Sequence, residues 1–286
     1  MLTKNNIPFV ENKPWEINFD DSLKEKFSSE EKIICVGCSI SSKYKEQKKS
    51  FPQYLHELIQ ITGKRYQVIN LSMWGIGLEL AIHKSNNFLD KYHDIKTKYL
   101  IIQVPEFTRR PIPNLNKDVI ENYCFNDYIK FTLEIVKGKN KVISYEKYVQ
   151  TLNLFVKKEF YSLKKFLIRL KKRYNIIPIV LLYDYYHPDP IFKKISDKYL
   201  NDILLFCDKK NILRTEIIPV DFMVQHKMNR QQTEHKWHDF HLNDKGASYF
   251  SRLILNLINQ KPMNKKLLFK KIQENQKIPD KIYTIY

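Results

Sequence analysis

The sequence has little glycine and no long apolar run. It contains only six glycines in 286 residues, so each glycine marks a position where the backbone itself deserves an explanation. No apolar stretch reaches the roughly eighteen residues that a membrane-spanning helix needs, and we expect no membrane span. The first residues, MLTKNNIPFVENKPWEINFDD, lack the apolar core of a secretory signal, which favours a cytoplasmic location.

Cysteine is also scarce. The four cysteines, Cys35, Cys38, Cys124 and Cys207, do not form the two CxxC pairs of a zinc site. Cys35 and Cys38 make a lone CxxC that is followed at once by Ser39, so neither a redox nor a zinc role is favoured. Reduced cysteines in a cytosolic compartment fit this pattern best.

Acidic residues are outnumbered, and the formal net charge is +18. Residues 157–173 carry eight Lys or Arg against one Glu, and residues 261–286 carry seven Lys against two acids. One interpretation is that lysine simply solvates the helices, since arginine, which suits phosphate contacts better, is in the minority. The other is an anionic partner: an acidic glycan, nucleic acid or an anionic lipid surface.

Short apolar runs alternate with helical patterns along the chain. The predicted strands are residues 32–37, 66–72, 98–104, 176–184 and 212–220. The predicted helices are residues 50–63, 77–93, 146–174, 190–210 and 244–259. Continuous apolar strands separated by helices are typical of a parallel sheet that is covered on both faces. The sequence therefore predicts an α/β class protein with three layers, α/β/α, and a sheet of about five strands.

One domain accounts for most of the chain. It is expected over residues 31–260, with an irregular insertion at about 111–145. Residues 1–30 form an N-terminal arm and residues 261–286 a basic C-terminal tail. In the first helix, Ser50 and Gln53 form a capping box, Gly63 ends the helix, and His56 is expected on the surface.

Ser39 is the first candidate for chemistry. It follows a buried strand and Gly37, so it can stand on a sharp turn at the carboxyl end of the strand, where ligands bind on such sheets. The alternative is a helix-capping serine, which is common.

A histidine and a carboxylate lie in the loop before the last helix. His241 can act as a general base, and Asp239, two residues earlier, can orient its ring. The alternative is an ordinary helix start, with Asn243 as the cap and His241 exposed. Trp237, two residues before Asp239, either forms the floor of a substrate cleft or packs against neighbouring side chains.

The segment NLSMWGIG, residues 70–77, follows the second strand and opens at the same edge. Gly75 can bring a backbone N–H close to a bound oxygen, and Asn70 can fix the turn by hydrogen bonds. A plain turn would also favour glycine. Asp184 and His187 follow another strand, either as site-lining or as loop residues.

These three segments resemble the SGNH hydrolase family, the GDSL-like esterases, over about residues 31–260. Gly37-Cys38-Ser39 resembles the family's Gly-Asp-Ser block in the Gly-Cys-Ser form of phage and virus-borne members. Residues 70–75 match its Asn-x-x-x-x-Gly block, and His241, Asn243 and Gly246 match its His-x-Asn-x-x-Gly tail. The resemblance implies a flavodoxin-like sheet.

Two features depart from the family pattern. The acid usually stands three residues before the histidine, whereas Asp239 is two before it, as in branches similar to the alginate acetyltransferases. The Gly-x-Asn-Asp block after the third strand is missing, and VPEFTRR, residues 104–110, stands in its place. Thr108 or Arg109 are the candidates for the oxyanion donor that this block supplies.

The resemblance implies a serine esterase. Ser39 would attack an ester, His241 would act as base and then acid, Asp239 would orient His241, and the N–H groups of Ser39 and Gly75, with Thr108, would bind the oxyanion. The family's usual chemistry implies removal of acetyl groups from a carbohydrate, without a metal or organic cofactor, and acyl transfer is a close variant. The alternative is a weakly active or inactive binding module, virion-associated, that contacts polyanions through its basic surface.

Overall fold

The computed structural model describes most of the predicted domain. The described residues are 24–25, 27, 29–38, 40–41, 47–73, 75–107, 109–114, 119–124, 145–184, 190–229 and 241–259. The predicted arm lies almost wholly outside them, as do the tail and most of the predicted insertion.

Five parallel strands form the central sheet. They are β1 (Glu31–Val36), β2 (Tyr66–Asn70), β3 (Thr97–Gln103), β6 (Ile177–Leu181) and β7 (Leu213–Arg214). Their order across the sheet is β2-β1-β3-β6-β7, and every neighbouring pair is parallel. The predicted α/β class and the five-stranded sheet are therefore confirmed.

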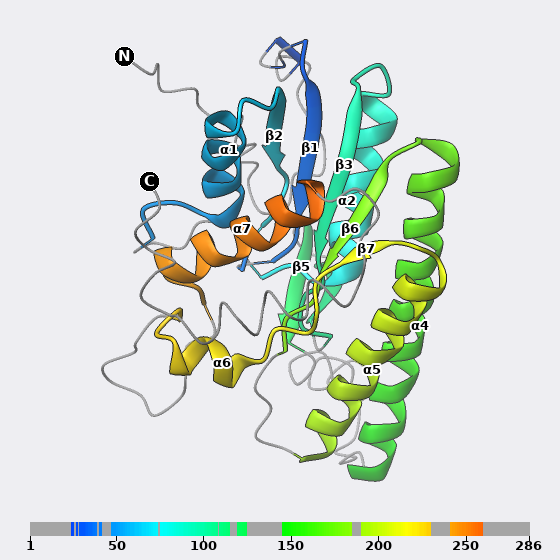
Figure 1. The fold of residues 1–286 in the computed structure, drawn as a ribbon. Coiled ribbons are helices and arrows are strands. Elements are labelled where there is room, and N and C mark those ends of the chain that lie inside the picture. The colour runs from blue at the N-terminus through cyan, green and yellow to red at the C-terminus, as the bar shows by residue number, and fades with distance from the viewer. Residues whose placement is uncertain are drawn as a thin grey trace.

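Helices cover both faces of the sheet (Figure 1). α1 (Phe51–Ile61) and α7 (Asp244–Asn259) lie together on one face and pack against each other. α2 (Leu78–Lys91) lies on the opposite face and packs against α4 (Tyr145–Arg173), which packs against α5 (Pro190–Lys209). A short helix that the sequence did not predict, α6 (Val220–Gln225), follows β7. None of the helices in the described part is long and apolar enough to cross a membrane.

The strand order reverses its direction beside β1. The chain runs outward from β1 to β2 and then crosses back to β3, β6 and β7, so the direction of winding reverses between β1 and β3. Ligands on such sheets bind outside the carboxyl ends of the strands at this reversal. A ligand site is therefore expected at the loops that follow β1 and β3.

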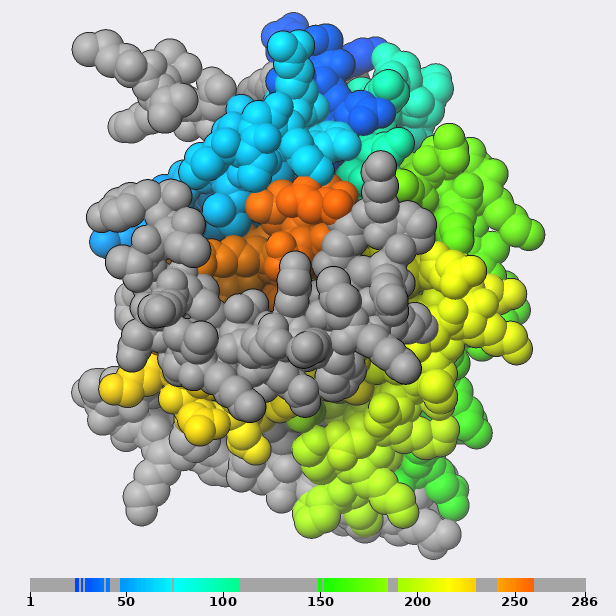
Figure 2. All heavy atoms as spheres, in the orientation of Figure 1, coloured from blue at the N-terminus to red at the C-terminus, as the bar shows by residue number. Residues whose placement is uncertain are grey.

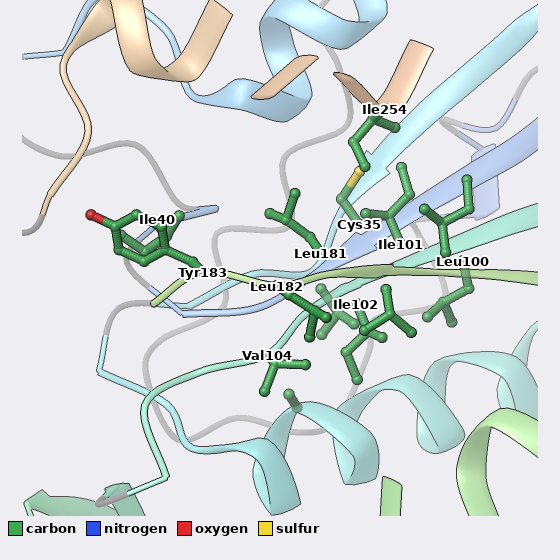
Figure 3. Packing of buried hydrophobic residues seen from close by; sticks show 14 of the residues in the cluster. Cys35, Ile40, Leu100, Ile101, Ile102, Val104, Leu181, Leu182, Tyr183 and Ile254 are labelled. Atoms are coloured by element: carbon green, nitrogen blue, oxygen red, sulfur yellow. The ribbon is translucent and has the colours of Figure 1, made fainter. Parts of the chain in front are cut away.

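Apolar side chains fill both sides of the sheet. Residues 33–36 of β1 are fully buried, as expected for a central strand of a parallel sheet. In Figure 3, Cys35 and Ile101 point toward Ile254 of α7, whereas Val104 lies on the opposite face of the sheet. Figure 2 shows the atoms of α7 in close contact with those of the α1 region.

The predicted helix ends are confirmed. The Ser50 backbone N–H donates to Gln53 Oε1 at 2.8 Å in the capping box of α1. Gly63 follows α1 with a φ of +72°, a conformation that glycine adopts without strain. Asn243 Oδ1 accepts the Gly246 N–H at 3.0 Å at the start of α7.

Two expectations are corrected. His56 is not on the surface: only 9% of it is exposed, because α1 is covered by α7 and β2, and this burial lowers the pKa of the imidazole. The predicted irregular insertion, about residues 111–145, is regular in its first part, since β4 (Arg109–Asn114) and β5 (Val119–Cys124) form an antiparallel pair.

Candidate active site

The loop after β1, residues 37–41, is tightly constrained around Gly37. A Cβ at Gly37 would lie 2.7 Å from both Gln103 Oε1 and Ser41 Oγ, distances that no side chain tolerates. The Gly37 carbonyl accepts the Met73 N–H at 3.1 Å, which extends the pairing of β1 with the β2 side beyond the strands. The glycine is therefore required by close approach of neighbouring atoms.

Cys38 and Ser41 close a turn within this loop. The Ser41 N–H donates to the Cys38 carbonyl at 2.9 Å. From β3, Gln103 Oε1 accepts the Cys38 N–H at 2.9 Å and the Cys38 S–H at 3.1 Å. Ser39, the predicted nucleophile, falls between the two ends of this turn in sequence but lies outside the described residues.

The loop after β2 is joined to the same turn. Asn70 is fully buried, and its Nδ2 donates to the Ser41 carbonyl at 3.2 Å. Its Oδ1 accepts the Ser72 N–H at 3.0 Å. Gly75 has a φ of +79° with open space where a Cβ would be, so it needs glycine for its backbone conformation. Asn70 thus fixes the loop after β2 and joins it to the loop after β1 through hydrogen bonds.

The loop before α7, residues 241–243, is fixed by its backbone. Leu242 forms an antiparallel bridge with Asn229, and the Asn243 N–H donates to the Met228 carbonyl at 3.0 Å. A Cβ on Gly246 would lie 2.4 Å from that same Met228 oxygen, so only glycine lets α7 begin here. His241 is half-buried at the start of this loop.

Four hydrogen bonds join this loop and α7 to α1 and to the segment that leads into α1. Gln47 Nε2 donates to the Leu242 carbonyl. Asp244 Oδ1 accepts the backbone N–H groups of Lys48 and Lys49 at 3.0 and 3.2 Å and the Tyr54 hydroxyl at 3.1 Å. Burial, followed by the Asp244 charge, raises the pKa of Tyr54 to about 12. Two segments almost two hundred residues apart in sequence therefore meet at one edge of the sheet.

The structure describes part of the predicted site. Ser39, Thr108, Trp237, Asp239 and His187 lie outside the described residues, and for Arg109 only the backbone in β4 is described. Of the predicted site, Asn70, Gly75 and His241 remain.

Asp184 follows β6 with most of its surface covered. Its carboxylate forms an ion pair with Lys193 of α5 at 3.2 Å, which directs it toward that helix. Among the described residues, no group of three or more His, Cys, Asp or Glu side chains is arranged to hold a metal ion.

Sequence reasoning missed the three polar side chains that connect these loops: Gln47, Gln103 and Asp244. Each reaches across at least 60 residues of sequence, so no local motif marks it. The only available signal was a polar residue at the end of an otherwise apolar strand, which applies to Gln103 in KYLIIQV.

Solved structures share this architecture. A catalytic mutant of Axe2, an acetylxylan esterase from Geobacillus stearothermophilus, matches with a TM-score of 0.52 and 13% identity over 82% of this chain and 96% of that chain. Unmutated Axe2 matches with a TM-score of 0.51 and 14% identity over the same shares. The fold is that of SGNH hydrolase structures.

A member of the lipolytic G-D-S-L family from Veillonella parvula matches less closely, with a TM-score of 0.49 and 12% identity over 80% of this chain and 99% of that chain. Neither the protein-family models nor the curated proteins give a match.

Proposed function

We propose that this protein is a serine ester hydrolase in which Ser39 is the nucleophile and His241 the general base. The observation that carries the proposal is the set of hydrogen bonds between the segment that leads into α1 and the loop before α7. The turn that brackets Ser39 in sequence lies beside the reversal of the sheet, and the segment that follows it is hydrogen-bonded to the loop that bears His241. Asp239, two residues before His241, is the proposed orienting carboxylate.

The proposed reaction has two steps. Ser39 Oγ attacks the ester carbonyl while His241 removes its proton, and the imidazolium then protonates the departing alcohol. Water, activated by His241, attacks the acyl-enzyme, releases the acid and restores Ser39. Arg109 and Trp237 are proposed to line the substrate side.

The proposed oxyanion donors are the backbone N–H groups of Ser39 and Gly75, with Thr108 as a third. Gly75 supports this role because its N–H donates no hydrogen bond to another described residue, and its φ of +79° is a conformation that glycine adopts without strain. The Cys38 N–H is already bound to Gln103 and does not contribute. Asn70 stabilises the loop that contains Ser39 by a hydrogen bond from its Nδ2 to the Ser41 carbonyl.

The proposed substrate is a carbohydrate that carries small acyl groups, acetyl first. The fold shared with an acetylxylan esterase supports this choice. We expect acetate release from acetylated xylo-oligosaccharides, and faster turnover of p-nitrophenyl acetate than of p-nitrophenyl octanoate.

Active-site labelling tests the proposed chemistry. A fluorophosphonate probe should label the wild-type protein on Ser39, and Ser39→Ala should lose both labelling and p-nitrophenyl acetate hydrolysis. Ser248→Ala, which removes a partly exposed serine of α7, is the matched control and should retain both. A folded wild-type protein that is neither labelled nor active would refute the proposal.

A second candidate function is binding of a polyanion by α4. Lys157, Lys165 and Lys172 are exposed on this helix, and Lys165 Nζ lies 4.4 Å from the ring centre of Tyr161, which is 54% exposed. An exposed basic row with an aromatic ring suits a nucleic acid. Binding of an oligonucleotide that weakens steeply between 50 and 200 mM salt would support it, because phosphate contacts release counterions. Unchanged binding after Lys157, Lys165 and Lys172 are all replaced by Gln would refute it.

A further inference from the structure

We propose that Gln103 is a positioning residue that fixes the loop bearing the nucleophile. This inference rests on the proposed function, because the position of the loop matters for catalysis only if Ser39 reacts. Gln103 is the last residue of β3, the strand next to β1 at the reversal of the sheet, and it is fully buried.

The Gln103 amide makes contacts in two directions. Its Nε2 donates to the Val104 carbonyl at 2.6 Å, which sets the orientation of the amide. Its Oε1 consequently faces the loop after β1 and accepts the Cys38 N–H at 2.9 Å, with Ser41 Oγ at 3.5 Å. Gly37 leaves no room between itself and this amide, since a Cβ there would lie 2.7 Å from Oε1.

These contacts hold both ends of the turn that brackets Ser39. Gln103 binds the Cys38 N–H, the last backbone amide before Ser39, and Asn70 binds the Ser41 carbonyl from the other side. The turn is therefore held between β3 and β2, the two neighbours of β1. The orientation of the peptide before Ser39 determines where the Ser39 N–H and Oγ can point.

An amide supplies this combination of groups at any pH. It offers an acceptor to Cys38 and a donor to the Val104 carbonyl from one planar group. Leucine has nearly the same size but would remove the Gln103 acceptor of the buried Cys38 N–H. Ionised glutamate would keep the acceptor but set a negative charge against the Val104 carbonyl oxygen.

Gln103→Leu tests the role, with Thr215→Val as the matched control. Thr215 Oγ1 accepts the buried Leu182 N–H at 2.9 Å, so Thr215→Val also removes a buried side-chain acceptor from a backbone amide, but after a different strand. We expect Gln103→Leu to slow fluorophosphonate labelling of Ser39 and to lower kcat by about tenfold or more, with little change in KM, because small displacements of reacting groups have large effects on rate.

Thr215→Val should change both rates by less than twofold, and Gln103→Glu should fall between the wild type and Gln103→Leu. Labelling by Gln103→Leu within twofold of the wild type would overturn the proposal. Loss of rate in Thr215→Val equal to that in Gln103→Leu would overturn it too, since the effect would then follow from lost stability alone.

Hydrogen exchange of the Cys38 amide provides a readout that does not depend on activity. The wild-type amide should be protected, and Gln103→Leu should remove that protection while the amides of β6 keep theirs. Fast exchange of Cys38 in the wild type would overturn the proposal even if Gln103→Leu failed to fold. If the Cys38 amide is protected in the wild type but Ser39 is never labelled, the proposed function is wrong and the role of Gln103 in holding the loop is not.

Discussion

Replacing Gly37 by alanine should destabilise the protein by much more than a glycine-to-alanine change in an open turn. The added Cβ would lie 2.7 Å from Gln103 Oε1 and Ser41 Oγ and 2.8 Å from Gln103 Cβ. Gln103 cannot move away cheaply, because its amide is bound to Cys38 and to the Val104 carbonyl.

Two effects contribute to the expected loss. Overpacking a filled site costs about 1–3 kcal/mol. If Gln103 is displaced, the buried Cys38 N–H loses its acceptor, which costs a further ~1–3 kcal/mol. Together these effects predict that Gly37→Ala lowers the free energy of unfolding by roughly 2–6 kcal/mol, a large share of the stability of a typical domain.

Urea unfolding followed by circular dichroism measures this loss, with Gly63→Ala as the control. Gly63 has a φ of +72° but nothing within 4 Å of its Cβ position, so alanine there is expected to cost only about 1–2 kcal/mol from backbone strain. A Gly37→Ala protein that is no less stable than Gly63→Ala would refute the steric explanation of Gly37.

Three further predictions concern other parts of the domain. Gly246→Ala should destabilise by roughly 2–4 kcal/mol in urea unfolding, because its Cβ would lie 2.4 Å from the Met228 carbonyl oxygen; wild-type stability would contradict this. Asp244→Ala should lose about 1–3 kcal/mol and lower the pKa of Tyr54 from about 12, as seen by NMR titration, since the carboxylate accepts the Tyr54 hydroxyl; an unchanged Tyr54 pKa would exclude the contact. Lys84 is fully buried, its Nζ has no hydrogen-bond partner among the described residues, and burial lowers its pKa to about 8. Between pH ~8 and ~10.4 the unfolded chain therefore binds more protons than the folded protein, so the wild type should become more stable as the pH rises through this range. Lys84→Met should be more stable than the wild type by about 3 kcal/mol at pH 7, and its stability should not rise in this way. The same dependence of unfolding free energy on pH in the wild type and in Lys84→Met would refute this prediction.

The sheet and the main helices were predictable because local patterns specify them. The central strands β1, β3 and β6 contain short apolar runs, and residues 50, 63 and 243 mark helix ends through side-chain and backbone chemistry that acts within a few residues. The β4 strand escaped prediction because Pro111 and Pro113 interrupt it, and proline argues against a strand.

The connections within the candidate site could not be predicted in the same way. The amide of Gln103 binds Cys38 across 65 residues, and Gln47 binds Leu242 across 195. His56 was wrongly expected at the surface because the packing of α7 over α1 is a tertiary contact between distant segments. The sequence marked Gly37 as a position with a backbone reason, but one of the two residues that exclude a side chain there, Gln103, is 66 residues away in sequence.

The central claim is that the Ser39 hydroxyl and the His241 imidazole meet at the carboxyl edge of the sheet. A crystal structure of the phosphonylated protein measures this directly. We expect the adduct on Ser39 Oγ, with His241 Nε2 within about 3 Å of it and a phosphonyl oxygen facing the Gly75 N–H. A His241 ring directed away from Ser39, or an adduct on any other residue, would contradict the account.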